Sequence, residues 1–218
     1  IEPNMATMLA FLATDAAVAP PLLRELLTEA VKPTFNACTI DGDMSTNDTV
    51  LLLANGASQV TIDHENPGAL AVFRDALHQV CRVLAEKIVA DGERITKVVC
   101  LTVEGAADAA QAERVARTIG NSLLVKSSWF GSDPNWGRVM DAAGAARVGL
   151  REERVEMDYD DVPVLRHGEA VPGNLAQWRA VVARPKFGIR LHLGLGEARY
   201  QLLATDLSTG YVDFNKAE

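Results

Sequence analysis

A threonine near the start of the chain stands where covalent chemistry is possible. Thr7 lies between the small residue Ala6 and an apolar run that begins at Met8, and a chain cut here would begin with a threonine. Such a threonine carries its own general base, because an α-amino group with a pKa near about 7.7 can accept the hydroxyl proton at neutral pH. On spacing alone, a buried threonine at the start of a strand is the commoner explanation.

Other groups of polar residues predict neither a metal site nor a cofactor. Residues 41, 43, 45 and 47 carry the oxygens that open a calcium-binding loop. However, Thr46 replaces the glycine that such a loop requires, and Leu52 replaces its bidentate glutamate. The four histidines have no metal-ligand spacing between them.

Apolar residues at helical spacing predict the helices that have to support a site. One helix follows the proline pair at 20–21 and ends before Pro33. A longer one covers residues 67–91 with a single apolar stripe, which requires a sheet to cover it. A third covers residues 108–120 with Asp108 as its N-cap, and Pro134 opens a fourth.

Strands are expected on both sides of these helices. Residues 50–54 and 98–103 are short runs of branched apolar residues between glycines, which predicts two buried strands. Apolar residues alternate at 155–159. The segments 189–193 and 200–203 flank two turn glycines, so we expect antiparallel hairpins in this part of the chain.

The mixture of helices and strands shows no regular βαβ repeat. It therefore predicts an α+β fold with mixed sheets and helices packed on one face of each sheet. The turn-rich stretch at 147–154 is the best candidate for a boundary. It separates an N-terminal part, residues 7–150, from a hairpin-rich part, residues 151–218.

Composition excludes several classes of protein. The 218 residues are 48% hydrophobic and 23% charged, which is typical of a soluble globular chain and not of disorder. A net charge of −8 repels a phosphate backbone, so we expect no nucleic acid partner. No apolar run approaches the roughly 20 residues needed to cross a bilayer. Three cysteines in apolar segments without C-x-x-C spacing favour a reducing cytoplasm.

Motifs along nearly the whole chain resemble those of the ornithine acetyltransferase family, also called bifunctional glutamate N-acetyltransferase. The segment around Thr7 is similar to the self-processing segment of that family. The other matching motifs are Ser-Thr-Asn-Asp-Thr at 45–49, Asp-Gly-Glu at 91–93 with Thr-Lys at 96–97, the segment 122–127, and Phe-Gly-Ser-Asp-Pro-Asn-Trp-Gly-Arg at 130–138.

The resemblance implies an enzyme of arginine biosynthesis, or of a related pathway that uses ornithine or arginine, made as a precursor that cuts its own Ala6–Thr7 bond. Residues 1–6 would then be the tail of an α chain, and Thr7 would begin a β chain. Family members transfer an acetyl group from N-acetylornithine to glutamate through an acetyl ester on this threonine, and usually assemble as α2β2 heterotetramers. The implied fold is the double-layered one shared with self-processing aminopeptidases.

The resemblance also assigns roles to two substrate-binding residues besides Thr7. Glu93 would bind the amino group of the substrate, although Arg94 and Ile95 replace Gly and Ala of the family pattern. Asn215 would bind the amino-acid head group, but the Ser or Thr that the family places about five residues later is missing from a sequence that ends at Glu218. Without the resemblance, both would be read as ordinary surface residues.

Other motif residues are expected to build the site, and some of it is expected to come from elsewhere. Residues 47–49 would shape the pocket floor, and residues 133–138 would form a cap and a helix start. The resemblance places the oxyanion hole, a Thr-Gly pair, in the α chain. Two other functions stay open: a self-processed aminopeptidase or amidohydrolase that uses water as acceptor, and a structural subunit in which Thr7 does no chemistry.

Overall fold

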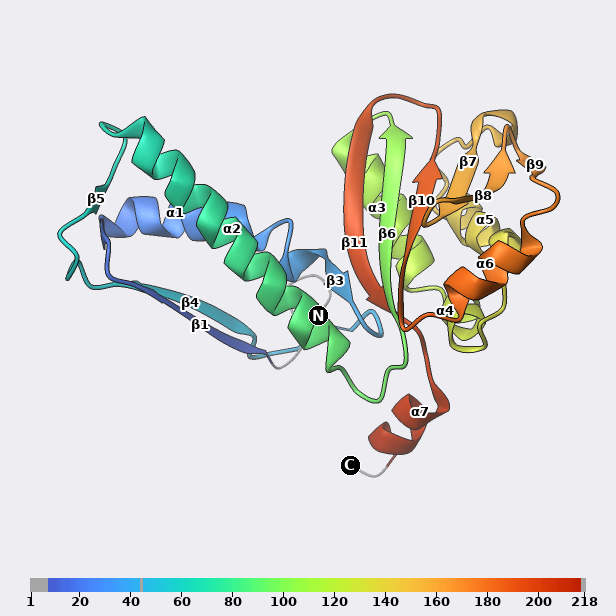
Figure 1. The fold of residues 1–218 in the computed structure, drawn as a ribbon, viewed down its shortest axis with the longest axis horizontal. Coiled ribbons are helices and arrows are strands. Elements are labelled where there is room, and N and C mark those ends of the chain that lie inside the picture. The colour runs from blue at the N-terminus through green and yellow to red at the C-terminus, as the bar shows by residue number, and fades with distance from the viewer. Residues whose placement is uncertain (1–7, 44, 217–218) are drawn as a thin grey trace. The chain divides into compact units, whose positions relative to one another are not determined.

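The structure of the chain is a computed structural model that describes residues 8–43 and 45–216 (Figure 1). By their internal contacts these residues divide into two compact units. Unit 1 holds the chain up to Cys38 and from Gly42 to Ile88, and unit 2 holds Thr39–Asp41 and the chain from Val89 onward. Each unit therefore has its own core.

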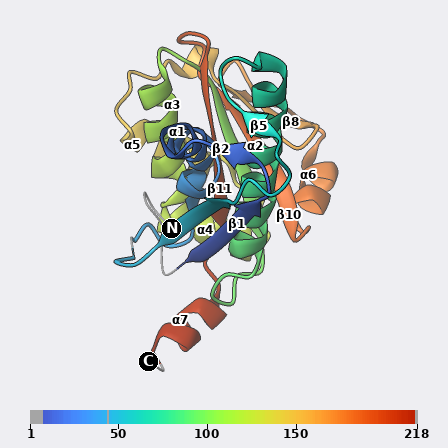
Figure 2. The same ribbon diagram turned by 90° about the vertical axis from the view of Figure 1, so that its left-hand side faces the viewer.

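Unit 1 consists of short parallel sheets and helices. Its elements are β1 (Leu9–Thr14), β2 (Ala17–Val18), α1 (Pro20–Val31), the 3-10 helix η1 (Phe35–Ala37), β4 (Thr49–Ala54), β5 (Thr61–Ile62) and α2 (Pro67–Ala90), whose last residues belong to unit 2. β1 runs parallel to β4, and β2 runs parallel to β5. Figure 2 shows β1 and β4 side by side.

Prolines and leucine spacing set the helices of unit 1. Pro20 is the first residue of α1, where a proline loses no hydrogen bond because the first N–H groups of a helix have no partner within it. Leu22, Leu26 and Ala30 recur every four residues and are buried. The predictions of α1 and α2 are confirmed, and the stripe of α2 faces the β1–β4 sheet.

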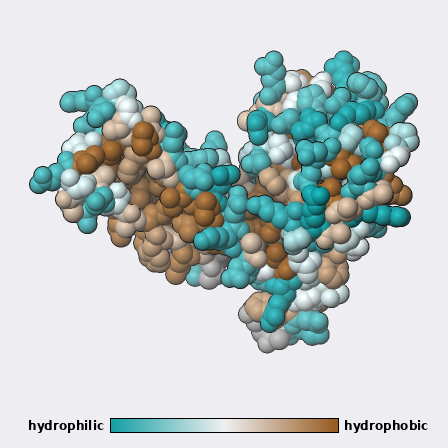
Figure 3. Space-filling view, in the orientation of Figure 1, coloured by the Kyte–Doolittle hydropathy of each residue, from teal (hydrophilic) through white to brown (hydrophobic). Residues whose placement is uncertain are grey.

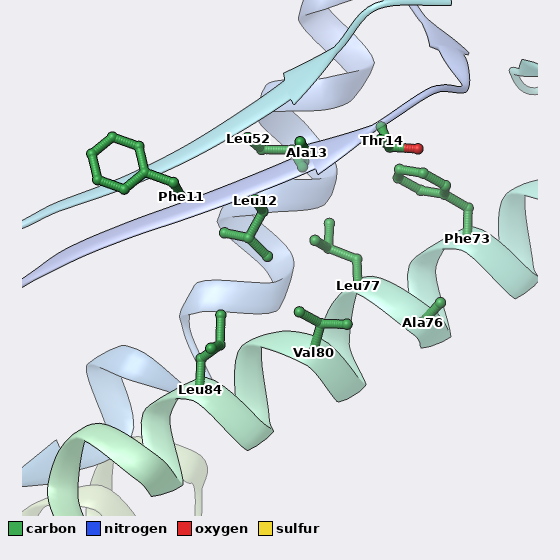
Figure 4. A pocket seen from close by; sticks show the side chains of 10 residues that line it. All are labelled: Phe11, Leu12, Ala13, Thr14, Leu52, Phe73, Ala76, Leu77, Val80 and Leu84. Carbon is green, nitrogen blue, oxygen red and sulfur yellow. The ribbon is translucent and has the colours of Figure 1, made fainter. Parts of the chain in front are cut away.

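An apolar cavity of about 520 Å³ lies between this sheet and α2 within unit 1 (Figure 4). Leu12 points from β1 towards α2, which contributes Leu77 and Val80 to the lining. The cavity therefore belongs to the packing between helix and sheet.

The prediction that β4 is a buried strand is right about the strand and wrong about its burial. Leu51 and Leu53 are 41% and 59% exposed, because side chains alternate between the two faces of a strand. On the neighbouring β1, Leu9 and Phe11 are 62% and 66% exposed. Parallel strands are normally covered on both faces, so one face of this strand pair is unusually open in unit 1.

The described strands of unit 2 form a mixed sheet in the order β3-β11-β6-β10-β7-β8-β9. Its strands are β3 (Cys38–Thr39), whose first residue belongs to unit 1, β6 (Val98–Ala106), β7 (Glu156–Tyr159), β8 (Val162–Arg166), β9 (Glu169–Ala170), β10 (Lys186–His192) and β11 (Ala198–Thr205). The helices of this unit are α3 (Ala109–Gly120), α4 (Leu123–Phe130), α5 (Trp136–Ala145), the 3-10 helix η2 (Glu152–Arg154), α6 (Leu175–Val182) and α7 (Thr209–Asn215). α3 packs on β6 and β11, and its apolar side chains join one buried core with those strands.

Polar caps fix where the helices of unit 2 begin. Asp108 caps α3 as predicted, and its Oδ1 accepts a hydrogen bond from Gln111 N at 2.7 Å. α4 was not predicted and begins after Ser122, whose hydroxyl accepts from Val125 N. Residues 133–138 form a cap and a helix start as expected, because the Asn135 side chain accepts from Arg138 N and α5 begins at Trp136.

The expected hairpin of β10 and β11 is also wrong. The two strands follow each other in the chain across turn glycines, but β6 lies between them in the sheet. β10 pairs with β6 in parallel and with β7 antiparallel, and β11 pairs with β6 antiparallel. β7 and β8 do form an antiparallel pair, as expected for this part of the chain.

The α+β fold class is confirmed by the mixed sheets and the helices that cover them. The expected boundary near residue 150 lies inside unit 2, whose sheet takes strands from both sides of it. As a division between residues 7–150 and 151–218 it stays a prediction. Within the described ranges, no helix combines the length and the apolar character needed to cross a bilayer.

Tyr200, on β11, predicts a pH dependence of stability. Burial raises the pKa of its phenol from 10.0 to about 12. Arg117, whose Nη2 donates to the hydroxyl at 3.1 Å, partly offsets this rise by lowering the pKa. Between these pH values the folded state keeps a proton that the unfolded state releases, so the free energy of unfolding falls as pH rises through the window. Urea unfolding measures the free energy of unfolding of wild type and of Tyr200→Phe. Relative to Tyr200→Phe, the free energy of unfolding of wild type should fall from pH 9 to pH 11. A difference between the two proteins that stays constant over this range would contradict the prediction.

Candidate active site

The predicted nucleophile Thr7 and its neighbour Ala6 lie outside the described residues, so their roles stay predictions. Met8, the next residue, is 5% exposed and is held at both of its backbone polar groups. Its carbonyl oxygen accepts from Thr49 N at 2.8 Å, and its N–H donates to Asp48 Oδ1 at 2.6 Å. Two of the three residues expected to shape the pocket floor thus fix the chain directly after Thr7.

The structure brings together the other two predicted site residues. Asn215 Nδ2 donates to Glu93 Oε2 at 3.0 Å, although 122 positions separate the two residues in the sequence. Glu93 lies in the loop between α2 and β6 and is half-buried, and Asn215 is the last residue of α7 and is exposed. A carboxylate and an amide are therefore presented side by side in unit 2.

Asp206 holds the loop that carries Glu93. This residue is 1% exposed. Its Oδ1 accepts from the backbone N–H groups of Thr96 and Lys97 at 2.9 and 3.0 Å, and its Oδ2 accepts from the Thr96 hydroxyl. Bonds from N–H groups and a hydroxyl to a buried carboxylate are strong, so the end of the loop is fixed to the end of β11.

Ser208 connects the same loop to α7. Its hydroxyl donates to Arg94 O at 2.6 Å and, as the N-cap of α7, accepts from Tyr211 N at 3.0 Å. The Tyr211 hydroxyl in turn donates to Asp41 Oδ2 at 2.8 Å. These bonds set the position of the helix that ends at Asn215.

Sequence reasoning missed Asp206, Ser208 and Tyr211 as supports of the site. A serine just before a helix start is a signal that could have found the cap at Ser208. The partners of Asp206 lie about 110 positions away, at Thr96 and Lys97, and no local pattern reveals them.

Arg94 has the left-handed conformation that the glycine of the family pattern would adopt without strain. Its φ is 60°, and this conformation costs a residue with a Cβ about 1 kcal/mol or more. The loop is also close to α7, because a Cβ added at Gly210 would lie 3.0 Å from Arg94 Cβ. The loop therefore holds Arg94 in a strained conformation close to α7.

Replacing Arg94 with glycine should therefore stabilise unit 2. The gain from lost strain exceeds the entropy that glycine adds to the unfolded chain, so we expect about 0.5–1 kcal/mol. Urea unfolding measures it, and Arg94→Ala is the matched control because alanine removes the side chain and keeps the strain. Equal stability of the two variants would contradict the strain argument.

The lysines of the matching motifs have structural partners. Lys97 is 5% exposed, and its Nζ donates to Ser132 Oγ at 2.6 Å and to the carbonyl oxygen of Val182. Burial lowers the pKa of Lys97, partly offset by Asp206. Lys126 is 1% exposed and donates to Thr205 O. These motif residues stabilise the framework around the Glu93 loop.

No group of three or more His, Cys, Asp or Glu side chains among the described residues is arranged to hold a metal ion. The polar groups around Glu93 in unit 2 are carboxylates, an amide and hydroxyls. Groups of these kinds form hydrogen bonds and bind charged groups.

Comparison with known proteins identifies the family. The sequence profile described as the ArgJ family matches residues 1–217. "Arginine biosynthesis bifunctional protein ArgJ" of Chlorobium chlorochromatii is 45% identical over 215 residues, 99% of this chain and 50% of that protein. "Glutamate N-acetyltransferase" of Methanopyrus kandleri is 41% identical over 218 residues, 99% of this chain and 56% of that protein. The chain thus spans about half the length of the curated relatives it matches.

A solved structure gives the same answer for the fold. The crystal structure of arginine biosynthesis bifunctional protein argJ from Bacillus halodurans matches with a TM-score of 0.91 and 33% identity. The match covers 97% of this chain and 100% of that one. The family resemblance seen in the motifs is confirmed, and the chain belongs to the ArgJ family.

Proposed function

We propose that the protein is a glutamate N-acetyltransferase that moves an acetyl group from N-acetylornithine to glutamate. The observation that carries the proposal is similarity over 99% of the chain to proteins named ArgJ and glutamate N-acetyltransferase. The pairing of Glu93 with Asn215 supports it, because an amino-acid substrate presents an ammonium and a carboxylate to its site.

In the proposed reaction Thr7 is the nucleophile and its α-amino group is the base. The hydroxyl oxygen attacks the acetyl carbonyl carbon of N-acetylornithine while the hydroxyl proton passes to the amine. The C–N bond then breaks, and ornithine leaves with that proton on its nitrogen. Glutamate attacks the acetyl ester through its own amino group, so that acetylglutamate leaves and the threonine oxygen regains a proton.

Glu93 and Asn215 are the proposed binding groups for the substrate. The Glu93 carboxylate suits a substrate ammonium, because ionic hydrogen bonds are about twice as strong as neutral ones. Both N–H groups of the Asn215 amide donate in the structure, to Glu93 Oε2 and to Tyr211 O at 3.0 Å each, so a substrate carboxylate would replace one of these two acceptors. The hydrogen bond between Glu93 and Asn215 fixes the two groups before substrate arrives. Fixed groups lose little freedom on binding, which favours affinity.

The amine of Thr7 is proposed to arise by cleavage of the Ala6–Thr7 bond. Attack of the Thr7 hydroxyl on the Ala6 carbonyl moves the acyl group from nitrogen to oxygen, and hydrolysis of the ester releases two chains. The same oxygen thus serves in processing and in acetyl transfer.

An α chain from the same precursor is the proposed partner, with α2β2 as the proposed assembly. The open face of the β1–β4 pair in unit 1 supports a partner, because it exposes Leu9, Phe11, Leu51 and Leu53 (Figure 3). About half of the length of the relatives lies outside the match. The α chain is also the proposed source of the oxyanion hole, and the cytoplasm is the proposed location.

The test is to supply N-acetylornithine with and without glutamate to the purified protein with its precursor partner. Acetylglutamate should form at a rate that saturates with both substrates, with ornithine released in equal amount. Steady release of free acetate at the same rate without glutamate would favour the amidohydrolase, since water would then be the acceptor.

A further inference from the structure

The carboxylate of Asp48 is placed to act on the residue that precedes Met8. The β1–β4 ladder begins with the pair Leu9 and Thr49, and the bond from Thr49 N to Met8 O extends it by one residue. At the next position the donor is Met8 N, and its acceptor is the Asp48 side chain at 2.6 Å. A side-chain carboxylate thus takes the place of a backbone carbonyl at the start of β1.

The bonded nitrogen belongs to the peptide group that joins Met8 to Thr7. A peptide group is planar, so an acceptor that fixes its N–H restricts the plane of the whole group. In an ordinary β-ladder, a carbonyl oxygen is a sufficient hydrogen-bond acceptor for a backbone N–H group. A full carboxylate here supplies a second oxygen and a negative charge within one peptide of the predicted nucleophile.

The second oxygen of Asp48 has no hydrogen-bond partner within the described part of the chain, although it is buried. A buried carboxylate oxygen without a donor is costly, because water no longer solvates it. A donor from a cationic group would remove this cost. Once Ala6–Thr7 is cleaved, the α-amino group of the adjacent residue Thr7 has N–H groups to donate, and it becomes cationic when it takes up the hydroxyl proton.

We propose that Asp48 is a positioning residue for the nucleophile, with Oδ1 fixing the Thr7–Met8 peptide and Oδ2 accepting a hydrogen bond from the α-amino group of Thr7. The inference rests on the proposed function, in which that amine is the base. A carboxylate beside the amine orients its lone pair and stabilises the ammonium that forms when the hydroxyl proton is taken up.

The experiment uses the assembled, processed protein and measures the rate of acetyl transfer to Thr7 from N-acetylornithine, by rapid quench and mass spectrometry, as a function of pH. Asp48→Asn keeps an oxygen for Met8 N but replaces the other oxygen with a donor. Asp43→Asn, an exposed acid in the same loop, is the matched control. If Asp48→Asn blocks processing, both variants are expressed as separate chains with Thr7 at the amino terminus.

In Asp48→Asn we expect the plateau rate to fall at least about tenfold, since general base catalysis contributes roughly 10²–10⁴. The acid limb of the pH–rate profile should also move to lower pH in Asp48→Asn. A carboxylate raises the pKa of a nearby amine, so loss of the carboxylate lowers that pKa. Asp43→Asn should match wild type.

A rate and pH profile equal to wild type in Asp48→Asn would overturn the proposal. A slower rate with an unmoved acid limb would overturn the contact between Oδ2 and the amine. Wild-type protein that transfers acetyl to glutamate without an acetyl group on Thr7 would instead refute the proposed nucleophile, and with it this inference. A Thr7→Ala variant run in parallel separates these cases.

Discussion

Replacing Thr7 with alanine should lower the rate of acetyl transfer at least about a thousandfold, since loss of a nucleophile removes the covalent route. It should also leave the precursor uncut, because the same hydroxyl is proposed to attack the Ala6 carbonyl. The two effects have one cause, so they should appear together. Intact mass of the purified protein measures the second, and acetylglutamate formation measures the first.

Thr14→Ala is a matched control for that variant. Thr14 is the last residue of β1, and its hydroxyl accepts one hydrogen bond from Ala16 N at 3.2 Å. Its loss should leave processing and transfer near wild type. A Thr7→Ala chain that is supplied already separated and retains full activity would contradict the nucleophile and support the structural subunit.

Changing Glu93 to glutamine should raise KM for N-acetylornithine and lower kcat/KM at least about thirtyfold. Glutamine keeps an oxygen that can accept from Asn215 Nδ2, so the loop should stay in place, but the negative charge is lost. Removing one member of an ion pair in a site costs about 2–5 kcal/mol. Steady-state kinetics with each substrate varied in turn provides the measurement.

The loss should be in substrate binding and not in folding. Urea unfolding of Glu93→Gln should therefore match wild type. Asn215→Ala, which leaves the Glu93 charge, should have a smaller effect on kcat/KM than Glu93→Gln. If Glu93→Gln and wild type have equal kcat/KM, the carboxylate does not bind the ammonium.

Local signals in the sequence predicted the elements whose causes are local. The prolines in the first turn of α1, the apolar stripe of α2 and the Asp108 cap of α3 each act within a few residues, and the sequence predicts each of them. Motifs matched to a family likewise supplied Glu93 and Asn215. The hydrogen bond between these two residues shows that the matched positions meet in space.

Features that depend on distant parts of the chain were not predictable in this way. The turn glycines after β10 predict a hairpin, but they carry no information about β6, which lies between β10 and β11. The composition of β4 predicts a strand without saying which of its faces is covered. Asp206 binds a loop about 110 positions away, and only the folded chain shows that contact.

Whether Thr7 carries the acetyl group can be observed on the protein itself. The assembled protein is mixed with N-acetylornithine without glutamate, quenched, digested and analysed by tandem mass spectrometry. We expect one acetyl group on the Thr7 hydroxyl of the peptide that begins at Thr7, and its loss when glutamate is added. Active protein with an unmodified Thr7, or with the Ala6–Thr7 bond intact, would show that Thr7 is not the acetyl carrier.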